Sequence, residues 1–537
     1  SEGIHLVVPR SSTKECIDFI CKDLQTAADY LPARWESENK NFGRITSGAA
    51  LALKGRVELL YASPLFNRAD DVTRWETAYQ TNLAAVKKLE EGNFGLAYEN
   101  NSGKNAAGWG KIFSDYIGSE GGGGTVSEAV LVTLYNNVSP AEHLQLEKWN
   151  GWEHSLRPAN AGGGGGMTPT AEMVDLFPMA DGKKPNDMNG SYDYNQELFF
   201  LNRDPRFYRT FAFPGVEWKF DSDDLKSFGE KGQLPYGING YTTGNNYKLW
   251  NYCWYDNVDD RNSNSKSGYA ADCLGTKNTG IYLRKRTDDL ALNSNPLYIF
   301  EKTSGNGFRQ SAAPYMEIRF AEVLLNYAEA ACGANHFDEA VNALKRIRKR
   351  VGYTDNCGLD PAIFNDRAKL FEAILYERQI ELAYEGKRFH DVRRWMLFDG
   401  GVGQEALKST WKLTGFNGNT CNYLGVEPLN GQRRHRIEVY AKNFIAAKSN
   451  NVYNEDKTIK ETYDELWNKR PTALSLTEDI TCTESADDEI TYADAKVKAL
   501  AQFYQEHFKR KNLSTDGNDE TILPTFKPYY YILGFKK

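Results

Sequence analysis

The stretch that decides the fold covers residues 377–395 and reads ERQIELAYEGKRFHDVRRW. It ends the second of two consecutive helical hairpins that the spacing of apolar residues predicts in this part of the chain. Glu377 and Glu381 stand four residues apart and so share one helix face, while Asp391 and Arg394 follow on the next helix. We expect an ion-pair network that fixes the angle between these two helices. An acid–base centre is the alternative, which no metal-ligand spacing supports.

The segment before this stretch fits the tetratricopeptide pattern of paired helices. Its large and small residues fall at the expected positions, which are Leu324, Tyr327, Ala328, Ala331, Ala340, Leu344 and Ile347. Gly333 and Gly352 stand where helix C-caps are expected. The basic run at residues 345–350 falls in the last turns of a helix, where cations complement the carbonyl end of the helix dipole. Paired helices of this kind favour a binding surface over an active-site cleft.

The first hundred residues predict three more helices. The first begins at caps among residues 11–13 and stops at Leu31, the second begins at Thr46, and the third runs from about Val72 to Leu89. The second helix is rich in small residues, which let paired helices approach closely.

Two long segments differ in composition, because glycine, asparagine and aromatic residues are frequent in them. Residues 121–124 and 162–166 are glycine tracts, and one short helix is expected with Thr168 as its N-cap and Pro169 at its first position. The rest predicts loops and short strands. We therefore expect a mainly α protein, in which tetratricopeptide-like hairpins support a large loop-rich region. The expected division of the single unit, residues 1–537, is a helical scaffold at 10–92 and 315–399 and a variable, ligand-facing region at 93–314 and 400–537.

Bulk composition excludes several classes of protein. The 537 residues are 41% hydrophobic and 26% charged, which is a globular balance, and the net charge of −7 argues against binding of nucleic acid. No apolar stretch approaches the roughly 20 residues that cross a bilayer, and the first residues show no signal peptide. The eight cysteines form no Cys-x-x-Cys pair. Cys253 with Cys273, and Cys332 with Cys357, are either disulfides or buried free thiols.

Motifs for catalysis and metal binding are missing from the sequence. Neither glycine tract is followed by Gly-Lys-Ser/Thr, and neither His-Glu-x-x-His nor Gly-x-Ser-x-Gly occurs. We expect no catalytic residue, no metal-ligating residue and no cofactor, although the carboxylate pair of a glycosidase would leave no motif. Residues 256–262 carry oxygen ligands without the spacing of a calcium loop. They predict a solvated turn, with a bound structural cation such as calcium as the alternative.

The best functional candidate is a cluster of aromatic residues in a polar, glycine-rich stretch. Its eight members, taken as ligand-binding candidates, are Tyr236, Tyr241, Tyr247, Trp250, Tyr252, Trp254, Tyr255 and Tyr269. Such rings stack on the C–H faces of sugars while nearby polar side chains bind hydroxyls, and peptides use the same chemistry through their amides. Trp250, Tyr252 and Trp254 alternate, so they would share one face of a strand. Packing in the core is the common alternative for any aromatic residue.

Segments along nearly the whole chain resemble the SusD/RagB family of nutrient-binding outer-membrane lipoproteins of Bacteroidetes. In family order they are VPRSS at 8–12, DLQTAADYLP at 23–32, GAALALKGRV at 48–57, YASPLFN at 61–67, PTAEMVDLFPMADG at 169–182, IRFAEVLLNYAEA at 318–330, the stretch at 377–395, and the terminal segment from Asn512 to Gly534. The resemblance implies that these signature positions build the scaffold, whereas the variable middle loops supply much of the ligand contact.

The resemblance also implies a function. It suggests a non-catalytic protein at the extracellular face of the outer membrane that captures oligosaccharides for import. Its partner would be a SusC-like TonB-dependent transporter, with the ligand held between the two proteins. An oligopeptide ligand, as in RagB-like members, is the first alternative, and a surface glycoside hydrolase is the second.

The chain departs from the family near its beginning. Family members are tethered by a lipidated N-terminal cysteine, but no lipobox is present here, and the helices that usually precede residues 8–12 are missing. Cys16 lies within a predicted helix and does not suit a lipid site. We therefore expect membrane contact through a lipid anchor that is not part of this chain, and a ligand site to which an absent segment would add residues.

Overall fold

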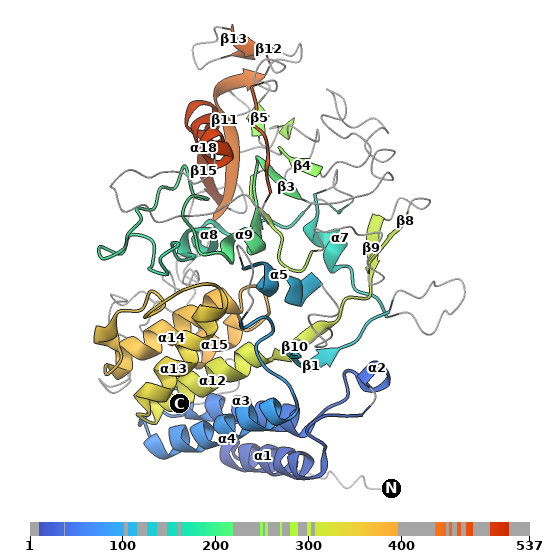
Figure 1. The fold of residues 1–537 in the computed structure, drawn as a ribbon, viewed down its shortest axis with the longest axis vertical. Coiled ribbons are helices and arrows are strands. Elements are labelled where there is room, and N and C mark those ends of the chain that lie inside the picture. The colour runs from blue at the N-terminus through green and yellow to red at the C-terminus, as the bar shows by residue number, and fades with distance from the viewer. Residues whose placement is uncertain are drawn as a thin grey trace, which may run out of the picture.

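The computed structural model of the protein describes residues 10–36, 38–100, 106–114, 126–136, 148–158, 163–164, 166–218, 247–250, 253–255, 269–270, 280–287, 298–301, 307–395, 435–446, 451–453, 459–462, 469–475 and 495–514. Within these residues the long helices gather mainly at one end of the molecule and most strands lie toward the other (Figure 1). The helices are α1 (Thr13–Tyr30), α2 (Glu38–Asn41), α3 (Ser47–Ala62), α4 (Val72–Glu91), α5 (Ala107–Ser114), α7 (Trp152–Leu156), α8 (Ala171–Leu176), α9 (Phe207–Thr210), α12 (Phe320–Gly333), α13 (Phe337–Arg350), α14 (Arg367–Glu381), α15 (Arg388–Arg394) and α18 (Ala495–His507), with a short 3₁₀ helix at Pro361–Ile363.

The strands of the described residues form small sheets. They are β1 (Ala129–Thr133), β2 (Phe211–Ala212), β3 (Val216–Trp218), β4 (Tyr247–Leu249), β5 (Cys253–Tyr255), β6 (Tyr269–Ala270), β7 (Tyr282–Leu283), β8 (Tyr298–Glu301), β9 (Gly307–Ser311), β10 (Tyr315–Arg319), β11 (His435–Ala446), β12 (Asn451–Tyr453), β13 (Ile459–Thr462), β14 (Leu474–Ser475) and β15 (Phe508–Ser514). The largest sheet has the order β13-β12-β11-β5-β6, with β15 also paired to β11. A second sheet has the order β14-β3-β4, and the pairs β1–β10, β2–β7 and β8–β9 stand by themselves.

Each of the three long N-terminal helices begins at a residue whose side chain caps it. Ser12 and Glu15 form a capping box at the start of α1, in which each side chain accepts a hydrogen bond from the other residue's backbone amide. Thr46 and Asp71 accept backbone amide protons in the same way at the starts of α3 and α4. The three predicted N-terminal helices are confirmed.

Small residues let α3 and α4 pack closely. A Cβ atom on Gly48 would stand 2.6 Å from Cδ2 of Leu89, and one on Gly55 would stand 2.4 Å from Oδ1 of Asn82. The side chain of Asn82 donates a hydrogen bond to the Gly55 carbonyl oxygen at 3.2 Å. The close approach expected from the small residues of α3 is confirmed here.

The second helical region begins with a strand. Residues Tyr315–Arg319 form β10, which pairs antiparallel with β1 and places Ile318 opposite Leu131. The chain then continues directly into α12, and α13, α14 and α15 follow. The helical scaffold expected from residue 315 therefore starts at Phe320, because the partner strand β1 holds the preceding residues extended.

Gly333 has a packing role instead of the predicted capping role. It is the last residue of α12, the cap is Ala334, and the left-handed backbone angle falls at Asn335, with φ of 67°. A Cβ atom at Gly333 would stand 2.2 Å from Cδ2 of Trp75, a fully buried ring. The prediction of a C-cap at Gly333 was wrong, because asparagine also tolerates the left-handed region. Gly352, with φ of 106°, follows the end of α13 as expected.

A similar correction applies to α8. Its N-cap is Thr170, whose hydroxyl accepts a hydrogen bond from the Met173 amide at 3.2 Å. Thr168 was predicted for this role, with Pro169 inside the helix. The helix begins two residues later than predicted, so Pro169 lies before the cap.

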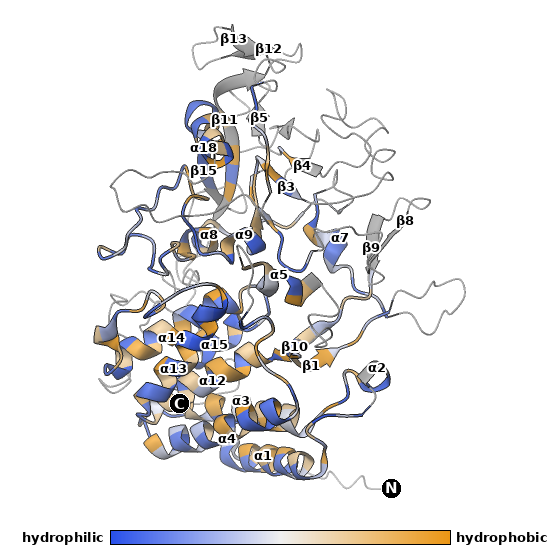
Figure 2. Ribbon diagram, viewed as in Figure 1, coloured by the Kyte–Doolittle hydropathy of each residue, from blue (hydrophilic) through white to orange (hydrophobic). Residues whose placement is uncertain are grey.

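The helices enclose a hydrophobic core centred on α12. Every residue of α12 is buried, and most are apolar (Figure 2). Trp75, Phe371 and Trp395 meet beside it, with ring centroids 5.0 to 6.4 Å apart. A second core joins α8, α9 and α18 to strands β2, β3 and β7. The predicted fold class, mainly α with tetratricopeptide-like hairpins and short strands, is confirmed. The division of the unit into scaffold and variable region stays a prediction.

Two of the cysteines in question are free thiols. Cys332 and Cys357 are both buried and form no disulfide with each other. Of the two alternatives, they are therefore buried free thiols. Burial raises the pKa of both thiols, which makes them unreactive. Cys253 lies in β5, and Cys273 is outside the described residues.

Substituting Gly333→Ala tests the packing of α12 against Trp75. We expect the variant to lose about 1–3 kcal/mol of unfolding free energy, because the new methyl group collides with a buried ring that has no room to move. Urea unfolding followed by circular dichroism measures the change. Lys87→Ala on the exposed face of α4 is the control and should leave stability within about 0.5 kcal/mol. A stabilised Gly333→Ala protein would show that helix propensity outweighs the collision.

Candidate ligand-binding region

Five of the eight predicted aromatic residues lie in or directly after β4, β5 and β6, and β4 and β5 belong to the strand-rich end of the molecule (Figure 1). Tyr247 begins β4, Trp250 directly follows β4, and Trp254 belongs to β5. Tyr255 ends β5, and Tyr269 begins β6. The other three candidates, Tyr236, Tyr241 and Tyr252, lie outside the described residues.

The prediction that the alternating aromatic residues share one strand was wrong. Trp250 follows β4, which pairs with β3 in one sheet, whereas Trp254 lies in β5, which pairs with β6 and β11 in another sheet. The prediction failed because alternation is a local pattern, whereas distant strands decide where a strand begins and ends. Residues 211–218 and 435–446 provide those partners.

Trp250 packs in the protein core. Its side chain is 2% exposed, its ring centroid lies 5.7 Å from that of Phe503 in α18, and the guanidinium of Arg470 lies 5.2 Å from its ring. Its burial matches the core alternative for aromatic residues. The proposal that Trp250 stacks on a ligand is therefore corrected, and its contribution is to join β4 to α18.

The register of β5 brings three other candidates onto neighbouring strands. Trp254 pairs with Tyr269 across the antiparallel β5–β6 ladder. Tyr255 pairs with Ile445 across the parallel β5–β11 ladder. Residues directly opposite each other on adjacent strands have Cα atoms roughly 4.5–5.5 Å apart. Trp254 and Tyr269 are thus the members of the predicted cluster that the described strands place opposite each other, whereas Tyr255, the next residue along β5, falls on the other face of the sheet. Their role in ligand binding stays a prediction.

A buried charge cluster ties this end of the molecule to the helical scaffold. It consists of five carboxylates and five cations, which are Glu128, Asp204, Glu377, Glu381, Glu385, Arg206, Lys285, Arg319, Arg348 and Arg350. All ten are buried. Arg319 donates to Glu128, Glu381 and Glu385, each at 2.7 Å, and Arg206 donates to Asp204 and Glu381, each at 2.8 Å.

The charge cluster fixes the protonation of its carboxylates. Burial alone would raise the pKa of Glu381, but Arg350, Arg319 and Arg206 hold that pKa well below its ordinary value. Burial would likewise raise the pKa of Glu385, yet Arg319 and Lys285 lower it to about 2. A glycosidase acid needs a raised pKa, because it must carry a proton at neutral pH. Glu381 and Glu385 have the opposite environment.

Ion pairs link α14 and α15, as predicted, but the residues that form them differ from those expected. Arg378 in α14 donates to Asp391 in α15 at 3.1 Å, and Arg394 donates to Asp391 at 3.0 Å. Arg394 also donates to Glu329 of α12 at 2.6 Å. Glu377 and Glu381, by contrast, pair with arginines outside this hairpin, so the prediction was wrong about the partners of these two residues.

The partners of Glu377 and Glu381 were missed in the sequence. Arg348 and Arg350 were assigned to the helix dipole of α13, but both side chains are buried and reach Glu377 and Glu381. Helix periodicity would place only one of two residues spaced by two on the buried side, so the burial of both had no signal in the sequence. Arg206 had no local signal.

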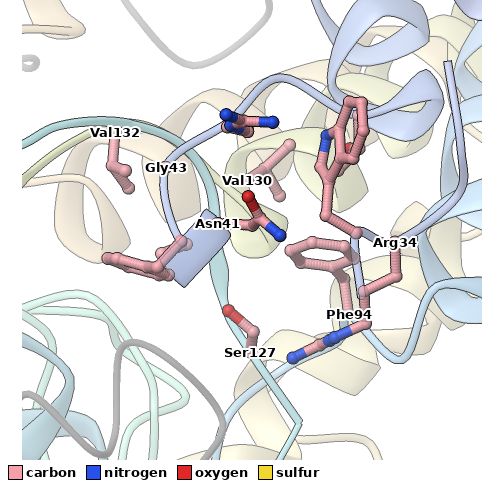
Figure 3. Close-up of a pocket in the computed structure, with 12 residues that line it drawn as sticks. Arg34, Asn41, Gly43, Phe94, Ser127, Val130 and Val132 are labelled. Atoms are coloured by element: carbon pink, nitrogen blue, oxygen red, sulfur yellow. The ribbon is translucent and has the colours of Figure 1, made fainter. Parts of the chain in front are cut away.

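Figure 3 shows a small hollow between β1 and the segment around α2. Arg34, Asn41, Phe94 and Ser127 line it, and the Arg34 guanidinium lies 5.1 Å from the Phe94 ring centroid. Arg34 also donates to the Gly92 carbonyl oxygen at 2.9 Å. The cavity volume of about 40 Å³ has room for a few water molecules only. This hollow does not suit a sugar or peptide.

Within the described part of the chain, no group of three or more His, Cys, Asp or Glu side chains is placed to hold a metal ion. The candidate calcium stretch, residues 256–262, is outside the described residues. A cation there stays a prediction. Among the described helices, none combines the length and apolar character of a membrane span.

Comparison with known proteins identifies the family. The model of the SusD family matches residues 110–472, more than half of the chain, and the chain belongs to that family. Members of this family are generally non-catalytic proteins that bind nutrients.

Two individual proteins illustrate the similarity. SusD-like protein P2 of Formosa agariphila is 34% identical over 131 residues, which cover 22% of this chain and a quarter (25%) of that relative. A crystal structure of a SusD-like protein from Bacteroides fragilis NCTC 9343 aligns with a TM-score of 0.51 and 22% identity, over 88% of this chain and 70% of that chain. The similarity to the Bacteroides fragilis structure shows a shared fold only.

Substituting Glu381→Gln tests the buried charge cluster. We expect a loss of about 3–5 kcal/mol of unfolding free energy, because Arg206, Arg319 and Arg350 would lose the charge that compensates their burial. Chemical denaturation measures this loss. Glu91→Gln removes an exposed partner of Lys88 and should cost at most about 1 kcal/mol. Equal stabilities of the two variants would contradict the role of the cluster.

Acid titration of stability tests Glu385 separately. Its folded pKa of about 2 lies below the unfolded value of 4.5, so its contribution is present above pH 4.5 and is lost as pH falls toward 2. The full effect is about 3 kcal/mol. Unfolding free energies measured between pH 5 and 2 should decline less steeply for Glu385→Gln than for the natural protein. Parallel declines would contradict this assignment.

Proposed function

We propose that the protein captures oligosaccharides at the extracellular face of the outer membrane, without transforming them. A SusC-like TonB-dependent transporter would receive the ligand, and a lipid anchor would hold the protein at the membrane. Membership of the SusD family supports this role. No cofactor is required for it.

The observation that carries the choice of ligand is the pairing of Trp254 with Tyr269. Two large aromatic residues stand opposite each other on adjacent strands. Aromatic rings present flat apolar faces with little conformational entropy to lose, which suits the C–H faces of sugar rings. The sheet that carries them pairs through β11 with β15, so its strands are held by long-range backbone hydrogen bonds.

An enzyme that cleaves glycans has less support from the described residues. Its acid would require a carboxyl whose pKa is raised, and a partner carboxylate roughly 5–9.5 Å away. Glu377 pairs with two arginines and Glu381 with three, so neither has the environment of such an acid. Binding, not hydrolysis, is therefore the function that we propose.

Substituting Trp254→Ala and Trp250→Ala separates binding from packing. We expect Trp254→Ala to weaken binding of a hexasaccharide at least about tenfold, or roughly 1.4 kcal/mol, with little change of stability. Trp250→Ala should instead lose about 3–5 kcal/mol of stability, because it leaves a cavity in the core. Calorimetric titration with a panel of hexasaccharides and hexapeptides measures affinity, and thermal unfolding measures stability.

The same titration decides between ligand classes. Binding of hexapeptides alone would overturn the choice of glycan in favour of an oligopeptide ligand. Unchanged hexasaccharide affinity in Trp254→Ala would remove the aromatic pair from the site. Release of shorter products from the hexasaccharides, followed by chromatography, would overturn the non-catalytic role.

A further inference from the structure

Two aromatic rings hold one arginine side chain where α7, β7 and β10 meet. The guanidinium carbon of Arg286 lies 5.2 Å from the ring centroid of Trp152 in α7 and 4.7 Å from that of Tyr315, the first residue of β10. Arg286 itself follows the end of β7 by three residues. All three side chains belong to partly exposed residues, so the group reaches solvent. We call Trp152, Arg286 and Tyr315 the arginine stack.

The N–H donors of Arg286 are available to a ligand. In the described part of the chain, its guanidinium forms no hydrogen bond and no ion pair, and its contacts are the two rings. Arg203 provides a comparison, because its guanidinium also lies over two rings, 4.7 Å from each centroid, but it is 1% exposed. Arg203 donates to four backbone carbonyl oxygens, at 2.7 to 3.5 Å, which belong to Val174, Phe177, Pro178 and Phe199. An arginine that serves the fold is therefore saturated with acceptors, whereas Arg286 is not.

The nearby carboxylate of Glu385 does not fill this role. Glu385 is close enough to feel the charge of Arg286. However, its carboxylate is buried and accepts from Lys285 at 2.7 Å and from Arg319 at 2.7 and 2.9 Å. These two cations already occupy both of its oxygens, and it forms no ion pair with Arg286.

Hydrogen bonds fix both rings of the arginine stack. The indole N–H of Trp152 donates to the Lys285 carbonyl oxygen at 3.4 Å, and the hydroxyl of Tyr315 donates to the Glu385 carbonyl oxygen at 3.1 Å. Lys285 and Glu385 are themselves members of the buried charge cluster. The rings are thus tied to the most constrained part of the molecule. A ligand would meet an ordered site, so little ordering would oppose its binding.

The backbone at Arg286 also supports a role for its side chain. Its φ of 73° is left-handed, a conformation that glycine or asparagine adopts at lower cost than arginine. Residues strained in this way are frequent at ligand sites, where the side chain compensates for the strain.

We propose that the arginine stack binds the carboxylate of an acidic sugar. A guanidinium donates two parallel hydrogen bonds to a carboxylate, and its planar fork matches the two oxygens better than an ammonium does. The rings beside it offer apolar faces to the C–H groups of the sugar that carries the carboxylate. The preference for a carboxylate rests on the stack itself, whereas the choice of a sugar rests on the proposed function.

Calorimetric titration of the full chain with hexagalacturonate and hexamannuronate tests the arginine stack. We expect at least one of them to bind, and Arg286→Gln to weaken that binding at least about tenfold, or roughly 1.4 kcal/mol. Arg286→Lys should weaken it at least about threefold, because an ammonium keeps the charge but lacks the fork. Methyl esterification of the ligand should have the same effect as Arg286→Gln. Arg68→Gln replaces an exposed arginine outside the stack and should bind like the natural protein.

Urea unfolding separates binding from packing in the same variants. Arg286→Gln should shift the unfolding midpoint much less than Arg203→Gln, which leaves four carbonyl oxygens without their donor. Equal losses of stability in the two variants would show that Arg286 serves the fold, and would overturn the site.

Binding outcomes can overturn the site as well. They are failure of both hexauronates to bind, equal affinity in Arg286→Gln, full affinity in Arg286→Lys, and equal affinity for the methyl ester. Arg286-dependent binding of a sulfated hexagalactan or of an acidic hexapeptide, in place of the hexauronates, would also contradict the proposal. The two proposals fail separately, because Arg286→Gln should leave the affinity for neutral hexasaccharides unchanged, whereas Trp254→Ala should reduce it.

Discussion

The structure depends on the ionised carboxylate of Glu381, which three arginines share. Arg206, Arg319 and Arg350 come from the segment before α9, from the end of β10 and from α13. Each guanidinium also binds a further carboxylate. Burying so many charges costs desolvation free energy, and excellent geometry is needed to offset it. The cluster therefore fixes the positions of its elements more than it adds to stability.

This constraint passes from the scaffold to the candidate ligand region. Asp204 and Arg206 precede α9, which leads through β2 into β3, and β3 pairs with β4. Trp250 then joins the end of β4 to α18, whose chain continues into β15 and so reaches β11 and β5. The strands with Trp254 and Tyr269 are thus connected to Glu381 through a series of backbone ladders and buried contacts.

The sequence predicted what local patterns determine. Caps among residues 11–13, the start at Thr46 and the spacing of apolar residues located the helices, because helix formation depends on neighbours within one or two turns. The partners of Glu377 and Glu381 could not be found in this way, since Arg206 stands 171 residues before Glu377. The prediction that Trp250 and Trp254 share one strand failed for the same reason. Their alternation looked like one strand, but β3 and β11 divide that segment between two sheets.

A binding role also follows from how the protein uses its charges. Neighbouring arginine and lysine side chains lower the pKa of the buried carboxylates of Glu381 and Glu385. Both are therefore ionised at neutral pH and have no proton to transfer. Arginine also organises loops at the surface, since Arg348 pairs with Glu377 and donates to the carbonyl oxygens of Gly182 and Cys357. One set of interactions therefore keeps these two carboxylates ionised and fixes loops at the surface. A scaffold whose buried carboxylates are held ionised in this way suits a binding role better than acid catalysis by those carboxylates.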